Sequence, residues 1–170
     1  MKRDQLTAER LREVLDYDPR TGGFSWRERR GSRAPVGPVK SKLASKDGYA
    51  RIQIDGVAYL AHRLAWLHHH GGWPAHNIDH RDQDPGNNRI KNLRDVAQAI
   101  NVQNCTKAKS HNKSGVQGVS QQRGGTFHAR ITVAHVRHEL GTYKTIEEAR
   151  AAYLGAKTML HPGWIKKASA

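Results

Sequence analysis

Residues 77–96, NIDHRDQDPGNNRIKNLRDV, constrain the fold of this chain more tightly than any other segment. The segment reads as an extended run, NIDH, then a turn built from Asp, Pro, Gly and Asn, then a second extended piece over 89–93. A helix is expected next, over 95–105, so the predicted order is strand, loop, strand and helix. This order brings an Asp-His pair, residues 79–80, close to several asparagine side chains.

The expected ββα arrangement places four polar residues around one site. Asp79 and His80 end the first strand, Asn92 lies at the second, and Asn101 lies on the helix facing back. Hydrolysis of a phosphodiester needs an activated water and a cation that holds the phosphate. A neutral imidazole can take the proton of that water, and a carboxylate with an amide oxygen suits a hard cation such as Mg²⁺ or Mn²⁺. The segment therefore predicts a metal-dependent phosphodiesterase site.

The run Asp79-His80, followed by NNRIKNL and then AINVQN, resembles the HNH endonuclease family, particularly the small phage and intron-encoded homing enzymes. The upstream AHRLAWLHHHGGWP is similar to the segment that precedes the motif in that group, and the resemblance covers roughly residues 49–105. It implies that His80 is the general base and that Asn92 holds the loop and orients His80. It also implies that Asp79 and Asn101 are the ligands of Mg²⁺ or Mn²⁺.

Several neighbouring side chains leave alternatives open. Many relatives carry His where this chain has Asn101, which argues against zinc, and Asn104, one turn further, is the alternative ligand. Asn87 and Asn88 are expected to shape the turn, although local hydrogen bonding could explain the whole Asn-rich loop.

Other aromatic and sulfur-containing side chains in and near the motif give less specific expectations. His68, His69 and His70 point in three directions on a helix, so they are expected at the surface or on phosphates. His62 could face the site or serve a packed structural role. A further group is expected to be buried or to anchor the core: Trp66, Trp73 and Cys105.

The segments before the motif give weaker expectations. Residues 6–16 predict a helix with Thr7 as its N-cap, and residues 29–47 predict a basic loop. A hairpin is expected to turn at Asp55-Gly56 and to lead into a short helix that ends at Gly71-Gly72.

The C-terminal part has a different pattern. Residues 106–113 are polar and basic and predict a linker, and three strand-like runs follow, GVQGVSQ, TFHARITVA and VRHELGTY. The last helix opens with a capping box formed by Thr145 and Glu148. Residues 114–160 resemble the Apetala-two (ethylene-response-factor) DNA-binding domain, which lays a three-stranded antiparallel sheet in the major groove and packs one helix behind it.

Strand alternation independently places Phe127, Ala129, Ile131 and Val133 on the face toward the helix, with Arg130 on the opposite face. The resemblance implies a set of DNA-facing residues, in which several positions that are arginine in the plant domains differ here. The set is Gln117, Ser120, Gln122, Arg130, Thr132, Arg137 and Glu139. Base preference cannot be carried over, although Gln and Arg side chains can still read base edges.

Composition narrows the class of partner. The chain has 29 Lys+Arg and 15 Asp+Glu among 170 residues, a net charge of +14, which favours a polyanionic partner such as nucleic acid. The two resemblances imply that this partner is double-stranded DNA. The part from residue 106 onward has 11 Lys+Arg against 3 Asp+Glu. No apolar run approaches the roughly 20 residues of a membrane span, and no signal peptide is evident, so a cytosolic location is expected, in the bacterial host if a phage encodes the chain. The single cysteine excludes an internal disulfide.

These observations predict an α+β chain with an HNH nuclease domain over 1–105, a linker over 106–113 and a sheet-and-helix DNA-binding domain over 114–170. The expected function is a metal-dependent DNA endonuclease with no small-molecule cofactor, acting as a monomer and nicking one strand. Two other classes stay open, a DNA-binding regulator with an inactive nuclease motif and an RNA-binding or ribosome-associated protein.

Overall fold

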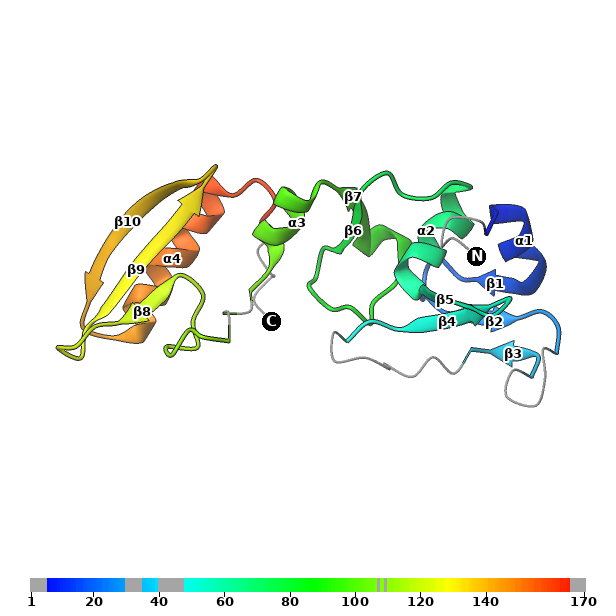
Figure 1. Cartoon of the computed structure of the whole chain (residues 1–170), viewed down its shortest axis with the longest axis horizontal. Helices are drawn as coiled ribbons and strands as arrows, with labels where there is room; N and C mark the ends of the chain where they lie inside the picture. Colours follow the sequence, from blue (N-terminus) through cyan, green and yellow to red (C-terminus); the bar gives the residue numbers. More distant parts are fainter. Residues whose placement is uncertain (1–5, 30–34, 40–47, 107, 109, 166–170) are drawn as a thin grey trace. The chain divides into compact units, whose positions relative to one another are not determined.

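The computed structural model describes residues 6–29, 35–39, 48–106, 108 and 110–165. The chain divides into two compact units, Met1–Gln98 and Ala99–Ala170, and each is described separately (Figure 1). The domain boundaries expected at 105 and 114 stay a prediction. The basic loop expected over 29–47 lies mostly outside the described residues.

The first unit opens with helix α1, Ala8–Val14, whose N-cap is the predicted Thr7; the Thr7 side chain accepts a hydrogen bond from the Arg10 backbone. The helix ends two residues earlier than the predicted residue 16, because Leu15–Tyr17 form strand β1. Alternate burial of β1, with both ends buried and the middle residue exposed, fits a half-buried strand. Strand β1 pairs with β2, Phe24–Trp26, and β3, Gly37–Pro38, adds an edge to this sheet, which the sequence reading missed.

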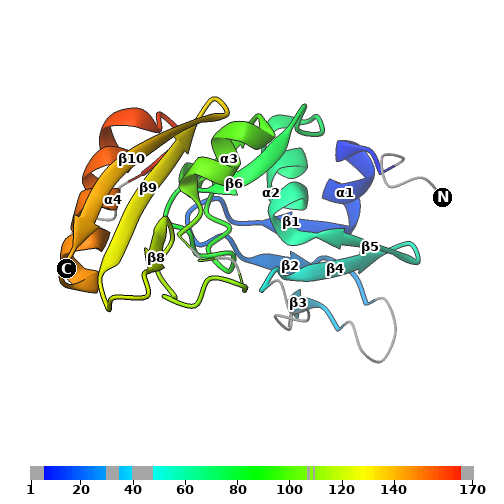
Figure 2. The ribbon, with the colours of Figure 1, turned by 60° about the vertical axis from the view of Figure 1, so that its left-hand side comes forward.

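A hairpin follows, with β4 spanning Arg51–Ile54 and β5 spanning Val57–Leu60. It turns at Asp55-Gly56 as predicted, and both residues have positive φ, 48° and 81°, as a tight two-residue turn requires. Helix α2, Ala61–His70, begins directly after it and ends at Gly71 in the left-handed conformation, again as predicted. Helices α1 and α2 contact each other and lie over the strands (Figures 1 and 2).

The segment that carries the Asp-His pair forms β6, Asn77–His80, and β7, Leu93–Val96, which pair antiparallel. The second strand was expected over 89–93, and this was wrong, because Ile90–Asn92 form a turn of 3₁₀-helix, η1. The shift matters for the site, since it sets which residue of β7 lies opposite each residue of β6.

One continuous core supports the first unit. Its members come from α1, α2 and all three pairs of strands, and Trp66 and Trp73 pack against it, as predicted. The largest fully buried side chains of this core are Leu11, Leu15, Ile54, Leu64 and Leu67.

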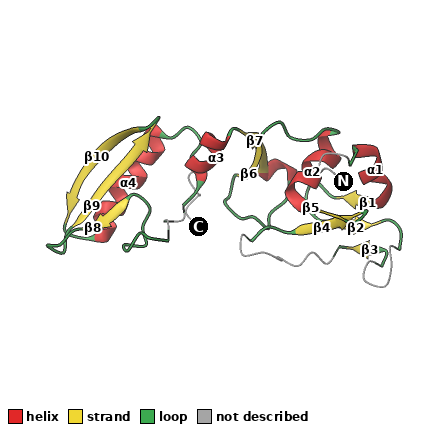
Figure 3. Ribbon diagram, in the orientation of Figure 1, coloured by secondary structure: helices red, strands yellow, loops and turns green. Residues whose placement is uncertain are grey.

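Helix α3, Gln98–Asn104, is shorter than the predicted 95–105 and lies almost wholly in the second unit. The rest of that unit is a three-stranded antiparallel sheet in the order β10-β9-β8, packed on helix α4 (Figure 3). Its elements are β8, Val119–Gln121, β9, Phe127–Val133, β10, Val136–Tyr143, and α4, Ile146–Leu160. Thr145 and Glu148 form the predicted capping box at the start of α4.

Ala129 and Ile131 on β9 are buried against Ala149 and Tyr153 of α4, the face that strand alternation predicted. The backbone just before β8 packs closely against the Tyr153 ring of α4, and this contact requires glycine at position 118. A Cβ on Gly118 would lie 2.1 Å from that ring. Within the described ranges, no helix is both long and apolar enough to cross a membrane.

Candidate active site

Asp79 and His80 end strand β6 and are both buried, at 7% and 4% exposure. Asp79 lies opposite Arg94 in the β6–β7 pairing. The Arg94 Nε donates to Asp79 Oδ2 at 2.8 Å, and Arg94 Nη2 lies 2.7 Å from the same oxygen. A guanidinium therefore neutralises this carboxylate within the site.

His80 is surrounded by polar and aromatic side chains. Its Nε2 lies 3.1 Å from the Asn88 side-chain oxygen. The buried His62 ring meets the His80 ring edge-on at 5.2 Å between centroids, and the Tyr49 ring lies 5.9 Å away. His62 thus contacts the site, which was one of the two alternatives left open for it.

Asn92 closes the loop between the two strands with its side chain. Its amide nitrogen donates to Asp82 Oδ1 at 2.9 Å and to the Asn87 carbonyl at 2.8 Å, while its oxygen accepts from the Asp82 backbone at 3.1 Å. The amide that contacts His80 is that of Asn88, so the expectation that Asn92 orients His80 directly is corrected.

The loop also holds a carboxylate in its charged form. Burial raises the pKa of Asp82, but hydrogen bonds from the Asp84 backbone and from the Asn87 and Asn92 amides outweigh burial. The pKa of Asp82 therefore lies below its ordinary value, and this side chain stays an acceptor at neutral pH.

A cation at this site would have few protein ligands. Among the described residues there is no group of three or more His, Cys, Asp or Glu side chains arranged to hold a metal ion. Asp79 belongs to the first unit and Asn101 to the second, so their assignment as joint ligands stays a prediction. The alternative Asn104 is buried and its side-chain oxygen accepts from the Ile165 backbone at 3.3 Å. Carboxylate and amide oxygens, the donor types expected here, are ligands that suit a hard cation.

The three consecutive histidines diverge, as expected, and His69 and His70 are exposed, but the expected surface position was wrong for His68. His68 is half-buried, with Nε2 3.2 Å from the Leu15 carbonyl, and burial lowers its pKa. His70 packs on the Trp66 ring at 4.1 Å. His69 lines a hollow of about 890 Å³ beside the loop. The other side chains of that hollow include three basic ones, Arg20, Arg89 and Lys91.

The second unit exposes one face of its sheet. Arg130 and Thr132 are exposed on β9 between buried neighbours, and their partners on β10 are Glu139 and Arg137. Because paired residues share a face, these four expected DNA-facing side chains lie together. Gln122 is exposed beyond β8, and Ser120 lies opposite His128, which contacts Glu139 at 3.1 Å.

Gln117 is the exception in that set. Its side-chain oxygen accepts from Lys157 Nζ at 2.9 Å, inside the unit. Lys157 is only 1% exposed, also donates to the Cys105 carbonyl at 2.6 Å, and lies 4.2 Å from the Trp164 ring. Burial lowers the pKa of Lys157 to about 8.

The expectation that Cys105 is buried was wrong, since its side chain is exposed.

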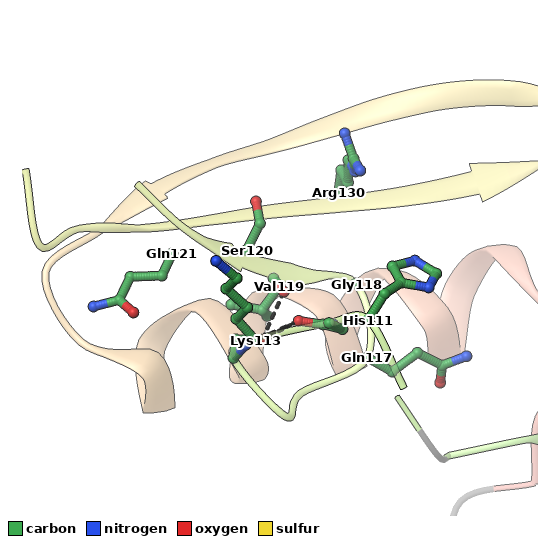
Figure 4. Close-up of a pocket in the computed structure, with 10 residues that line it drawn as sticks. His111, Lys113, Gln117, Gly118, Val119, Ser120, Gln121 and Arg130 are labelled. Atoms are coloured by element: carbon green, nitrogen blue, oxygen red, sulfur yellow. Dashed lines mark hydrogen bonds between the residues drawn. The ribbon is translucent and has the colours of Figure 1, made fainter. Parts of the chain in front are cut away.

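A hollow of about 480 Å³ opens beside this face. The loop before β8 forms one wall, and it is fixed because Ser114 Oγ donates to the Val119 carbonyl at 2.7 Å. In Figure 4, Ser120 and Arg130 project from the strands on the same side, Lys113 reaches up from the loop, and Gln117 points away. Among the described lining residues none is acidic.

Sequence reasoning missed Asn88, Arg94 and Tyr49 as members of the site and left the position of His62 open. A strand placed at Leu93–Val96 instead of 89–93 would have paired Arg94 with Asp79, so the register error hid the ion pair. Asn88 stands in a pair of identical residues, and nothing in the pattern tells which of the two turns inward.

Comparisons with known proteins place part of the chain beside one family and one relative. Residues 59–103 match the model of the HNH endonuclease family, and this match includes Asp79, His80, Asn92 and Asn101. The DNA endonuclease I-HmuI of Bacillus phage SP01 is 36% identical over 81 residues, which are 45% of this chain and 47% of that protein. The solved structure described as "DNA binding and cleavage by the HNH homing endonuclease I-HmuI" shares 29% identity, with a TM-score of 0.41, over 54% of this chain and 51% of that one. The chain thus spans about half the length of the relatives it matches.

Proposed function

We propose that this protein is a metal-dependent DNA endonuclease that hydrolyses phosphodiester bonds with His80 as the general base. The observation that carries the proposal is the buried Asp79-His80 pair at the end of β6, inside the part of the chain that matches the HNH model. The I-HmuI relative is itself a DNA endonuclease, which supports DNA as the substrate. A homing or phage-type role follows from the same likeness.

The residues divide the chemistry between them. His80 takes the proton of the attacking water, and Asn92 keeps the loop closed through its bonds to Asp82 and Asn87. Asp79, together with Asn101, would hold Mg²⁺ or Mn²⁺, which when bound supplies positive charge to the scissile phosphate. Arg94 holds the Asp79 carboxylate in place through its contact with Oδ2.

The second unit would bind double-stranded DNA in the manner of the Apetala-two domains. Its exposed sheet face carries Arg130, Thr132, Arg137 and Glu139, and the sheet packs on a single helix. The hollow next to this face, with Lys113 and Arg130 on its walls, suits a backbone phosphate. We propose that the protein acts on DNA as a monomer.

A second candidate is a DNA-binding regulator with an inactive nuclease motif. One observation favours it: the Arg94 guanidinium already contacts the carboxylate that a cation would need. A regulator of this kind would bind DNA and leave it intact whatever cation is added.

Incubation of supercoiled plasmid with the protein separates these functions. The endonuclease cleaves with Mg²⁺ and not with EDTA, and His80→Ala abolishes cleavage while DNA affinity changes by no more than a few-fold. His76→Ala serves as the matched control, because His76 is an exposed histidine of the same unit that pairs with Asp95. Equal cleavage by the His80 variant would remove this residue from the mechanism. Tight DNA binding without cleavage would favour the regulator, and a preference for RNA would favour neither.

A further inference from the structure

The side chain next to His80 decides which of its ring nitrogens carries a proton. Asn88 Oδ1 lies 3.1 Å from His80 Nε2, and Asn88 is itself buried, at 6% exposure. An amide oxygen accepts, so with Asn88 Oδ1 facing the ring this contact favours the tautomer in which His80 Nε2 is the donor. In a neutral imidazole the lone pair then belongs to Nδ1, which becomes the basic nitrogen.

The position of Asn88 is fixed from outside its own loop. The Tyr17 hydroxyl donates to the Asn88 backbone carbonyl at 2.7 Å. Two residues further, the Ile90 backbone donates to the Pro19 carbonyl at 3.1 Å. Between them, a Cβ on Gly22 would lie 2.6 Å from the Asn88 and Arg89 backbone, so only glycine permits this approach. The β1–β2 hairpin therefore contacts residues 88–90 at three points.

Tyr17 is suited to this task. It is buried at 8% exposure, and its ring packs on Phe24 at 4.9 Å and on His68 at 5.7 Å. Burial raises the pKa of Tyr17 to about 12, so its hydroxyl keeps its proton at any physiological pH. The ring contacts leave the hydroxyl little freedom to leave the Asn88 carbonyl.

We propose that Asn88 and Tyr17 are positioning residues for His80, and that the β1–β2 hairpin of residues 15–26 is a working part of the nuclease site. This inference rests on the proposed function, in which His80 is the base. The hairpin precedes residues 59–103, the part that matches the HNH model, and the Asp18 side chain shapes its turn by accepting from the Arg20 backbone at 2.8 Å. The contacts of this N-terminal hairpin with residues 88–90 thus help to keep the His80 imidazole in one tautomer and one orientation.

The physical reason is the sensitivity of proton transfer to geometry. A general base must lie within hydrogen-bond reach of the water, and a ring free to rotate spends much of its time outside that range. Loss of the partner that orients a histidine at a reactive centre costs roughly 10- to 100-fold in activity. Loss of the Tyr17 hydroxyl removes one ordinary hydrogen bond a step further away, for which about 2- to 10-fold is expected.

The test compares three variants of the full chain in plasmid cleavage with Mg²⁺. Asn88→Leu keeps the size of the side chain and removes the acceptor, and it should lower kcat about 10- to 100-fold with little change in KM. Asn88→Asp keeps an acceptor oxygen and should retain most of the wild-type kcat. Tyr17→Phe should lower kcat about 2- to 10-fold. Tyr143→Phe is the matched control, because that hydroxyl also donates to a backbone carbonyl at 2.7 Å, in the second unit.

A second readout does not depend on cleavage. Nitrogen-15 NMR of the imidazoles at neutral pH should show the His80 proton on Nε2, with a slowly exchanging signal that Asn88→Leu loses and Asn88→Asp keeps. A proton on Nδ1, or equal loss of kcat in the Leu and Asp variants, would overturn the positioning role. A wild-type protein that shows the Nε2 proton and does not cleave would refute the nuclease function and leave the contact itself established.

Discussion

Lys157 offers a prediction whose sign and size follow from its surroundings in the second unit. Lys157 as a whole residue is 1% exposed, and burial lowers the pKa of its ammonium group from 10.5 to about 8. Between these two values the unfolded chain holds the proton while the folded unit has released it. The unfolded state then binds more protons, so the free energy of unfolding must rise with pH across this window.

The magnitude follows from the same difference. Each pH unit contributes about 1.4 kcal/mol once the folded lysine has lost its proton, so between pH 8 and 9.5 the gain is up to about 2 kcal/mol. Below pH 8 both states are protonated and the slope disappears. The window stops at 9.5 because Tyr153, whose pKa burial raises to about 12, begins to oppose the effect as the tyrosines of the unfolded chain ionise.

The assay is urea unfolding of the full chain at a series of pH values. Unfolding of this unit is monitored by the NMR signal of the Ile131 methyl group, which lies in its core. Lys157→Met is the comparison, because it keeps the length of the side chain and cannot titrate. Wild-type stability should climb relative to the variant from pH 8 upward. Parallel profiles would refute the reasoning, and would mean that the Gln117 oxygen, the Cys105 carbonyl and the Trp164 ring hold the ammonium charged in spite of its burial.

Three further predictions follow from the site and the sheet face. Asp79→Ala should lose Mg²⁺-dependent cleavage over a full metal titration; restored cleavage at high Mg²⁺, or stoichiometric zinc in the purified protein, would contradict the ligand assignment. Lys113→Ala and Arg130→Ala should each reduce the slope of log affinity against log salt by about 0.9, measured by anisotropy with duplex DNA, and an unchanged slope would place these residues away from phosphates. A site with one base should nick plasmid to the open-circle form first, so immediate linearisation by a protein shown to be dimeric on DNA would overturn the monomer.

Local pattern was enough to predict several elements of the fold. The Asp55-Gly56 hairpin, the Thr7 cap and the Thr145 capping box depend on neighbouring residues alone, and all three are present. The sheet of β1, β2 and β3 was missed because its strands are two or three residues long, and Leu15 continues the apolar spacing of the helix before it. Short strands that pair across a turn leave too few residues for a period to show.

The candidate site was predictable in part for a similar reason. The Asp79-His80 pair stands out in the sequence, but its partners depend on register and on distant segments. Arg94 contacts Asp79 because the two residues pair across β6 and β7, and Arg94 lies one residue beyond the strand that was predicted. The contact between Tyr17 and Asn88 joins residues 71 positions apart. No periodicity in the sequence encodes a bond of that span.

The hydrogen bonds with which Asn92 closes its loop constrain how far the length of that loop can vary. Surface loops commonly accept inserted residues, because their backbone is held by little except water. Here one amide spans the loop with bonds to the backbone and side chain of Asp82 and to the carbonyl of Asn87, so the number of residues between those anchors is set by the reach of a single side chain. An added or removed residue between 82 and 87 would break two or three of these bonds together. Natural variants of this loop should therefore differ in residue type and keep a constant length.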